Sequence, residues 1–93
     1  MCVLTDEQIK QALKDLNVAW SAIPGQGLVR VYETTSFSEG MQLVKKIAVV
    51  SDEHNHFPSI NLAPNEVEIT LSTPSKNGLT EIDVKLAKAI DEI

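Results

Sequence analysis

The chain has 93 residues, a hydrophobic share of 43% and a net charge of −5 at pH 7. This length suits one small domain, so we treat residues 1–93 as a single unit. The negative charge argues against a nucleic-acid surface, which needs a basic face. No apolar run approaches the roughly 20 residues of a membrane span, and no secretory signal is visible. The one cysteine, Cys2, cannot form an internal disulfide, which fits a cytoplasmic location.

Residues 5–16 have the pattern of a first amphipathic helix. Thr5 is a good N-cap residue, and Gln8 three positions later completes a capping box. Apolar residues then recur at helical spacing, at Ile9, Ala12, Leu13 and Leu16.

Residues 19–23 and 28–33 are predicted to be two strands. The turn sequence Pro24-Gly25-Gln26-Gly27 separates them, so we expect an antiparallel hairpin.

A longer helix is predicted from residue 37 to about residue 51. Ser36 caps it and Glu39 closes a capping box. Gly40 weakens the helix by roughly 1 kcal/mol relative to alanine, and we expect it to admit another backbone closely. Helical spacing predicts a buried face made of Phe37, Met41, Val44, Ile47 and Ala48.

The second half of the chain predicts two more strands and a last helix. Ile60 and Leu62 mark a short strand, and a turn at 63–65 leads into the alternating strand 66–72. Thr80 caps a helix that runs to residue 93, with Asp83 at the capping-box position.

The predicted order is therefore α-β-β-α-β-β-α. Two hairpins joined by a helix make an α+β fold, a four-stranded antiparallel sheet with three helices packed on one face. Its free edge strands and open sheet face need covering, which predicts a homo-oligomer, with a dimer as the simplest form.

Chemistry-bearing side chains gather in residues 52–58, between the long helix and the next strand. Such connections often carry function. His54 suits a helix end, where a histidine favours the dipole. For His56 we consider two interpretations: a loop residue whose side chain is hydrogen-bonded to the backbone, or a residue that faces a ligand. We predict no metal site, because His54-Asn55-His56 lacks an obvious third ligand.

The chain resembles the pterin-4a-carbinolamine dehydratases across nearly its whole length, most strongly from Asp52 onward. The family pattern is an acid, three residues, a His-His pair and a Pro, and later a third His and an Asp. The matching positions are Asp52, His56, Pro58, the segment Thr70 to Thr73, residues 78–81 and Asp83, with Trp20 and Phe37 at family aromatic positions.

The chain departs from the family pattern at positions where the family has the histidines that carry its chemistry. Phe57 stands where the family has its second histidine, and Pro74 stands at the third. Ala63 and Pro64 replace an expected aromatic residue.

Members of that family eliminate water from a 4a-hydroxy-tetrahydropterin. The reaction needs an acid that protonates the leaving hydroxide and a base that takes the N5 proton of the pterin. Imidazole suits both proton transfers because it titrates near neutrality. The side chains of phenylalanine and proline carry no proton that could be transferred. The resemblance implies residual catalytic roles for His56 and Asp83. It implies a ligand pocket of Asp52, Phe57, Pro58, Thr73 and Pro74, with no cofactor and a pterin as ligand or substrate.

Three functions follow from this resemblance. The leading one is a dehydratase-like protein with a degraded site that acts as a homo-oligomeric binding or assembly factor. A branch of the family is implicated in Rubisco assembly in the α-carboxysome, which makes Rubisco the most specific candidate client. The alternatives are an active or weakly active 4a-hydroxytetrahydrobiopterin dehydratase and a pterin-binding protein without turnover.

Overall fold

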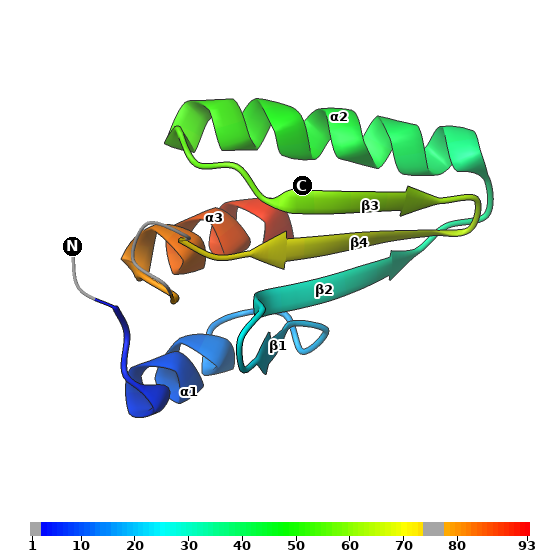
Figure 1. Cartoon of the computed structure of the whole chain (residues 1–93). Helices are drawn as coiled ribbons and strands as arrows, with labels where there is room; N and C mark the ends of the chain where they lie inside the picture. The colour runs from blue at the N-terminus through cyan, green and yellow to red at the C-terminus, as the bar shows by residue number, and fades with distance from the viewer. Residues whose placement is uncertain (1–2, 74–77) are drawn as a thin grey trace.

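The structure is a computed structural model that describes residues 3–73 and 78–93. Its elements confirm the predicted order and fold class (Figure 1). They are α1 (Asp6–Lys14), β1 (Ser21–Ile23), β2 (Gly27–Glu33), α2 (Phe37–His54), β3 (Ser59–Ala63), β4 (Glu66–Leu71) and α3 (Glu81–Asp91).

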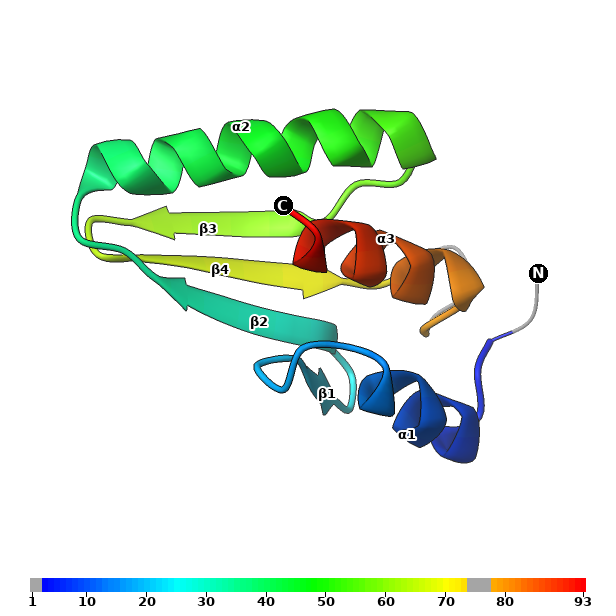
Figure 2. The same ribbon diagram turned by 180° about the vertical axis from the view of Figure 1, so that it is seen from behind.

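The four strands form one antiparallel sheet in the order β1-β2-β4-β3. Leu28 of β2 lies opposite Leu71 of β4, and Ile69 of β4 lies opposite Ile60 of β3. The two hairpins therefore join through β2 and β4, and β1 and β3 form the edges. Figure 2 shows the same order from behind.

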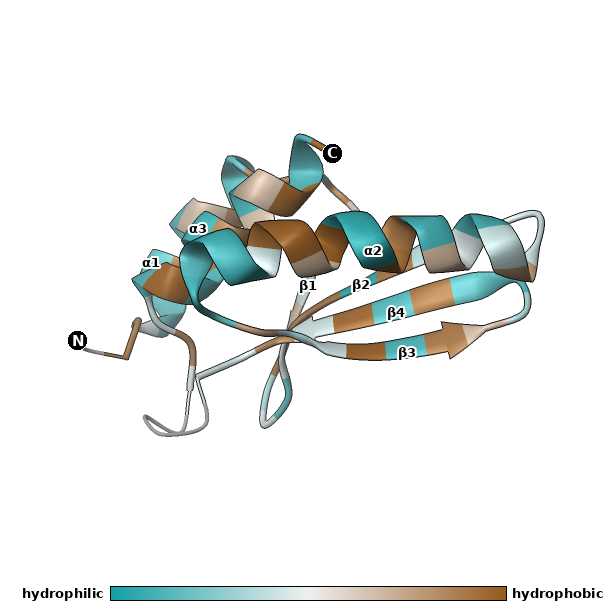
Figure 3. Ribbon diagram, turned by 90° about the horizontal axis from the view of Figure 1, so that it is seen from above, coloured by the Kyte–Doolittle hydropathy of each residue, from teal (hydrophilic) through white to brown (hydrophobic). Residues whose placement is uncertain are grey.

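A single core fills the space between this sheet and the helices. Val67, Ile69 and Leu71 alternate along β4 and are fully buried, as predicted. Side chains from all three helices or their ends share this core, and Figure 3 shows α2 lying along the strands. The buried members are Leu16, Trp20, Leu28, Ile47, Val67, Ile69, Leu71, Leu79, Leu86, Ala87 and Ile90.

Several element bounds differ from the sequence prediction. Helix α2 continues to His54, three residues past the predicted end, so Asp52 and Glu53 are helical rather than part of a loop. It stops at Asn55, which adopts the left-handed conformation with φ of 50°, a helix-ending geometry that asparagine tolerates. Strand β1 is also shorter than predicted, since it begins at Ser21.

The predicted buried face of α2 is partly wrong. Gly40, Ile47 and Ser51 face the core, whereas Phe37 is 51% exposed and Met41 is 40% exposed. Ala48 is also exposed.

Small residues explain this rotation of α2. A Cβ added to Gly40 would lie 2.7 Å from Leu62 Cδ1 and 3.3 Å from Val67 Cγ2. Strand side chains, rather than another backbone, therefore need the space. The Ser51 hydroxyl donates to the Ile47 carbonyl at 2.7 Å, so a polar residue can be buried here.

A second group of contacts ties the end of α3 to the first half of the chain. The Asp91 carboxylate accepts hydrogen bonds from the Asn17 amide at 2.9 Å and from Trp20 Nε1 at 2.7 Å, and it pairs with Arg30. The Arg30 guanidinium stacks 4.1 Å from the Tyr32 ring centroid. Burial raises the pKa of the Tyr32 phenol, and the positive charge of Arg30 opposes that rise.

We expect Asp91→Ala to lower the free energy of unfolding by about 2–4 kcal/mol, because it leaves the largely buried Arg30 unpaired. Urea unfolding measures the loss as a lower midpoint. Glu92→Ala is the matched control, since Glu92 is exposed and should change stability by less than about 0.5 kcal/mol. Equal shifts in the two variants would contradict this role for Asp91.

Candidate functional site

The site begins where α2 ends. The His56 amide donates to the Ser51 carbonyl at 3.2 Å, and the left-handed Asn55 between them turns the chain. This turn directs the His56 ring toward α3. Its Nε2 lies 2.6 Å from Asp83 Oδ1, although the two residues are 27 positions apart. The His56 side chain is 14% exposed and that of Asp83 is fully buried.

Asp83 is held from the other side by the residues that lead into α3. Its Oδ2 accepts a hydrogen bond from the Thr80 amide at 3.0 Å and one from the Thr73 hydroxyl at 2.8 Å. The hydroxyls of Thr73 and Thr80 lie 3.0 Å apart and share a further bond. Asp83 therefore caps α3 and also holds the His56 ring, which confirms its predicted capping position and leaves its catalytic role a prediction.

This arrangement defines which nitrogen of His56 can exchange protons. An ionised carboxylate only accepts hydrogen bonds, so His56 Nε2 carries the hydrogen that points to Asp83. Among the described residues, no hydrogen bond engages Nδ1 of His56. That nitrogen can take a proton when the ring is neutral and give one when the ring is charged.

The other predicted pocket residues do not join this hydrogen-bonded cluster. Asp52 is exposed in the last turn of α2. Phe57 is 60% exposed, and Pro58 is half-buried just before β3. Pro74 lies outside the described residues. Of the predicted set, the structure thus brings His56, Asp83 and Thr73 together.

Thr80 is the member of the cluster that the sequence reading placed only as a helix cap. Its hydroxyl is fully buried against Thr73. The available signal was the Thr80 to Asp83 spacing, because a capping pair puts an acid close to the preceding backbone.

His54 lies apart from the site. Its Nδ1 is 3.0 Å from the Val50 carbonyl within α2, and its side chain is exposed. Over residues 3–73 and 78–93, no three His, Cys, Asp or Glu side chains are placed to hold a metal ion. None of the helices in those ranges is long and apolar enough to cross a bilayer.

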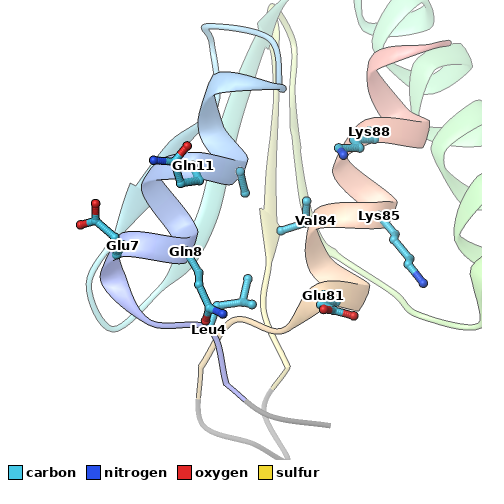
Figure 4. Close-up of a pocket in the computed structure, with 9 residues that line it drawn as sticks. Leu4, Glu7, Gln8, Gln11, Glu81, Val84, Lys85 and Lys88 are labelled. Carbon is cyan, nitrogen blue, oxygen red and sulfur yellow. The ribbon is translucent and has the colours of Figure 1, made fainter.

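Two surface grooves lie elsewhere on the molecule. One, of about 520 Å³, runs between α1 and α3 and has Leu4, Gln8, Val84 and Lys85 in its lining (Figure 4). The other, of about 830 Å³, lies beside the turn between β1 and β2. Neither is lined by His56 or Asp83, so we place the candidate site by its proton-transfer chemistry and not by the size of a groove.

The fold and the cluster together define a class. A buried carboxylate orients an imidazole at the end of an α+β sheet, and such a pair is chemically able to transfer protons. The chain belongs to the pterin 4 alpha carbinolamine dehydratase family, whose model matches residues 3–93.

Individual relatives support this membership. A Burkholderia pseudomallei protein named "Putative pterin-4-alpha-carbinolamine dehydratase" is 40% identical over 91 residues, covering 97% of this chain and 89% of the relative. A Mycolicibacterium vanbaalenii protein of the same name is 38% identical over 93 residues, covering 100% and 98%.

Two solved structures share the fold. A transcriptional coactivator/pterin dehydratase from Brucella melitensis superposes with a TM-score of 0.87 and 30% identity, covering 97% of this chain and 96% of that one. A pterin dehydratase-like protein identified as a RuBisCO assembly factor in the alpha-carboxysome superposes at 0.66 with 22% identity, covering 80% and 87%. At that identity the second comparison supports the fold alone.

We expect Thr73→Val to lower the free energy of unfolding by about 1.5–3 kcal/mol, because it removes a hydrogen bond to a buried charged group. Thr70→Val is the control, since Thr70 alternates with buried residues of β4 and is only half-buried. Urea unfolding gives the stability. If Thr73→Val behaves like Thr70→Val, the hydroxyl does not hold Asp83.

Proposed function

We propose that this protein binds a 4a-hydroxy-tetrahydropterin and dehydrates it slowly, with His56 as its proton-transfer group and Asp83 as the residue that orients it. The supporting observation is the 2.6 Å contact between His56 Nε2 and the fully buried Asp83 carboxylate. Such a pair fixes the ring and its tautomer before substrate arrives. The membership of the family supplies the substrate class.

The proposed reaction breaks the bond between C4a and its hydroxyl oxygen. Hydroxide leaves poorly, so protonated His56 gives a proton from Nδ1 and the group departs as water. The electron pair of N5 forms the new C4a–N5 double bond, and the N5 proton passes to Nδ1 of the now neutral His56. This transfer restores the protonated ring, so the net change is loss of one water.

One imidazole must serve both proton transfers in this scheme. The family pattern offers three histidines, and here Phe57 and Pro74 occupy two of those positions. A positioned acid or base contributes about 10²–10⁴ in rate. We therefore expect turnover well below that of a relative with all three histidines.

The test follows quinonoid product from the carbinolamine against a buffer blank. We expect a rate above the blank for the natural protein and the blank rate for His56→Ala. His54→Ala is the matched control, since that exposed histidine bonds only within α2, and it should keep full activity. A rate unchanged in His56→Ala would contradict the assignment.

A second candidate function is a binding or assembly role without turnover. The observation that favours it is the position of Phe57, 60% exposed where the family has a proton-carrying histidine. An exposed aromatic ring suits contact with a protein client. One structural neighbour acts in RuBisCO assembly, which makes Rubisco the client to test.

A double variant distinguishes the two candidate functions. If the site has lost turnover, the natural protein gives the blank rate and Phe57→His combined with Pro74→His regains activity of about 10²-fold or more. In the same case, adding the protein to refolding Rubisco subunits should raise the yield of assembled enzyme. Turnover in the natural protein and no effect on assembly would reject the second candidate.

The proposal extends to self-association in the cytoplasm. β3 is an edge strand in the described sheet, and Val31 on the open face is 42% exposed. Edge strands and apolar patches are commonly covered by a partner. We propose a homo-oligomer, with a dimer as the simplest closed form.

A further inference from the structure

The groove between α1 and α3, which we call the α1–α3 groove, separates two helices whose facing sides are apolar at their base. Its volume is about 520 Å³, within the roughly 300–1,000 Å³ range of ligand sites. Leu4, Ala12 and Val84 form an apolar floor, and all three are half-buried. Helix α1 is amphipathic, yet none of its residues is fully buried. The rest of the chain therefore covers the apolar side of α1 incompletely.

The α1–α3 groove is elongated along the helix axes. Its lining residues recur every three or four positions on both helices (Figure 4). On α3 they extend from Glu81 to Lys88, which is two turns and roughly 10 Å. On α1 they extend from Glu7 to Ala12. A groove of this form fits a rod-shaped ligand, and a helix laid in an apolar groove is a recurring mode of protein recognition.

The two helices run in the same direction along the groove. The Leu4 amide donates to the Leu79 carbonyl at 2.7 Å, so the segments that lead into α1 and α3 are joined where both helices begin. Figures 1 and 2 show both helices running from that point toward the same side of the molecule. The positive ends of their two dipoles therefore lie together at one end of the groove, and the negative ends lie at the other.

Charged side chains divide between these two ends. Glu7 is in the first turn of α1 and Glu81 is in the first turn of α3, so both carboxylates lie where the helices begin. Lys85 and Lys88 line the later part of α3, and Lys88 is in its last turn (Figure 4). All four residues are exposed, and none of them has an ion pair within the described ranges. The α1–α3 groove thus has an acidic end and a basic end.

We propose that the α1–α3 groove binds an amphipathic helix of a partner protein, and that this helix runs antiparallel to α1 and α3. The apolar stripe of the partner helix packs on the floor of the groove. Its acidic first turn lies at the basic end, and its basic last turn lies at the acidic end. This inference goes beyond the functions proposed above, because it depends neither on turnover at His56 nor on Rubisco as the client.

Electrostatics favour the antiparallel direction. Acidic residues in the first turn and basic residues in the last turn stabilise a helix, and α1 and α3 both have this pattern. A partner helix with the same pattern matches the charged ends of the groove only when it runs against α1 and α3. Its dipole then also opposes the two parallel dipoles of the groove. In the parallel direction its acidic first turn would lie beside Glu7 and Glu81.

The length of the groove sets the expected strength of binding. Helix α3 has 11 residues, which corresponds to roughly 16 Å. One helix in this groove covers less than the roughly 800 Å² per partner of standard stable interfaces. We therefore expect a transient complex with a dissociation constant in the micromolar range or weaker.

A synthetic peptide tests the proposal. It has about 14 residues, which span the groove as a helix, with glutamates in the first turn, lysines in the last turn and leucines at i, i+4, i+7 and i+11. A hydrocarbon staple on its polar side keeps it helical, because short peptides are marginal helices in water. Titration into isotope-labelled protein should shift the NMR amide signals of Leu4, Ala12 and Val84 until they saturate. Shifts confined to other surfaces, or none at millimolar peptide, would overturn the proposal.

Charge reversal tests the basic end. Lys85→Glu combined with Lys88→Glu should raise the dissociation constant of the peptide about tenfold at low ionic strength, because the variant repels the acidic first turn. The matched control is Lys45→Glu combined with Lys46→Glu, which makes the same change of charge at exposed positions of α2 and should have little effect. Circular dichroism checks that both variants fold. Equal losses of affinity in the two variants would overturn the assignment to the α1–α3 groove.

A nitroxide on the N-terminus of the peptide tests the direction. In the antiparallel complex it should broaden the amide signal of Lys88 more than that of Glu7, with the reduced label as control. Stronger broadening at Glu7 would overturn the antiparallel direction. These experiments leave the dehydratase assay unaffected, because neither His56 nor Asp83 lines the groove.

Discussion

The buried carboxylate of Asp83 is the constraint on which the candidate site depends. An ionised carboxylate with no exposed surface is costly unless every lone-pair direction meets a donor. Asp83 meets this requirement with three donors from three separate segments, His56 after α2, Thr73 after β4 and Thr80 at the start of α3. One side chain thereby fixes the ends of three elements at one point of the sheet, and the imidazole is held there as part of the same network.

The sequence predicted the parts of the fold that local signals determine, and it did not predict the parts that depend on contacts between distant residues. The alternation in β4 and the caps at Thr5, Ser36 and Thr80 are local signals, so they predicted the element order correctly. The orientation of α2 is not local. It is decided by the lack of a side chain at Gly40, where a Cβ would meet Leu62. A count of apolar residues could not reveal this, because α2 also carries apolar residues that stay exposed, such as Phe37, Met41 and Val49, and the sheet selects which side is buried.

In the candidate site, too, the sequence predicted some residues correctly and misplaced others. His56 and Asp83 were named through resemblance to a family, and no spacing rule connects two residues 27 positions apart. Their contact requires the left-handed Asn55 that ends α2 and reverses the chain toward α3. Asp52 shows the opposite case. Sequence pattern placed it with His56, but α2 continues past it and leaves its side chain on the exposed surface of the helix.

The burial of the Asp83 carboxylate also bears on why this chain has a histidine at position 56 and none at position 57. His56 is a donor to a buried charge, so replacing it would leave Asp83 partly unpaired whatever the fate of the pterin chemistry. Phe57, at the position of the second family histidine, is mostly exposed and makes no such bond in the described structure. A histidine there could be exchanged with little cost to folding, whereas one at 56 could not. The hydrogen bond to Asp83 therefore accounts for a histidine at position 56 even without the proposed catalytic role. Turnover is therefore the property that distinguishes a slow dehydratase from a scaffold in which the His56–Asp83 pair is only structural. A slow dehydratase loses turnover in His56→Ala and keeps it in His54→Ala.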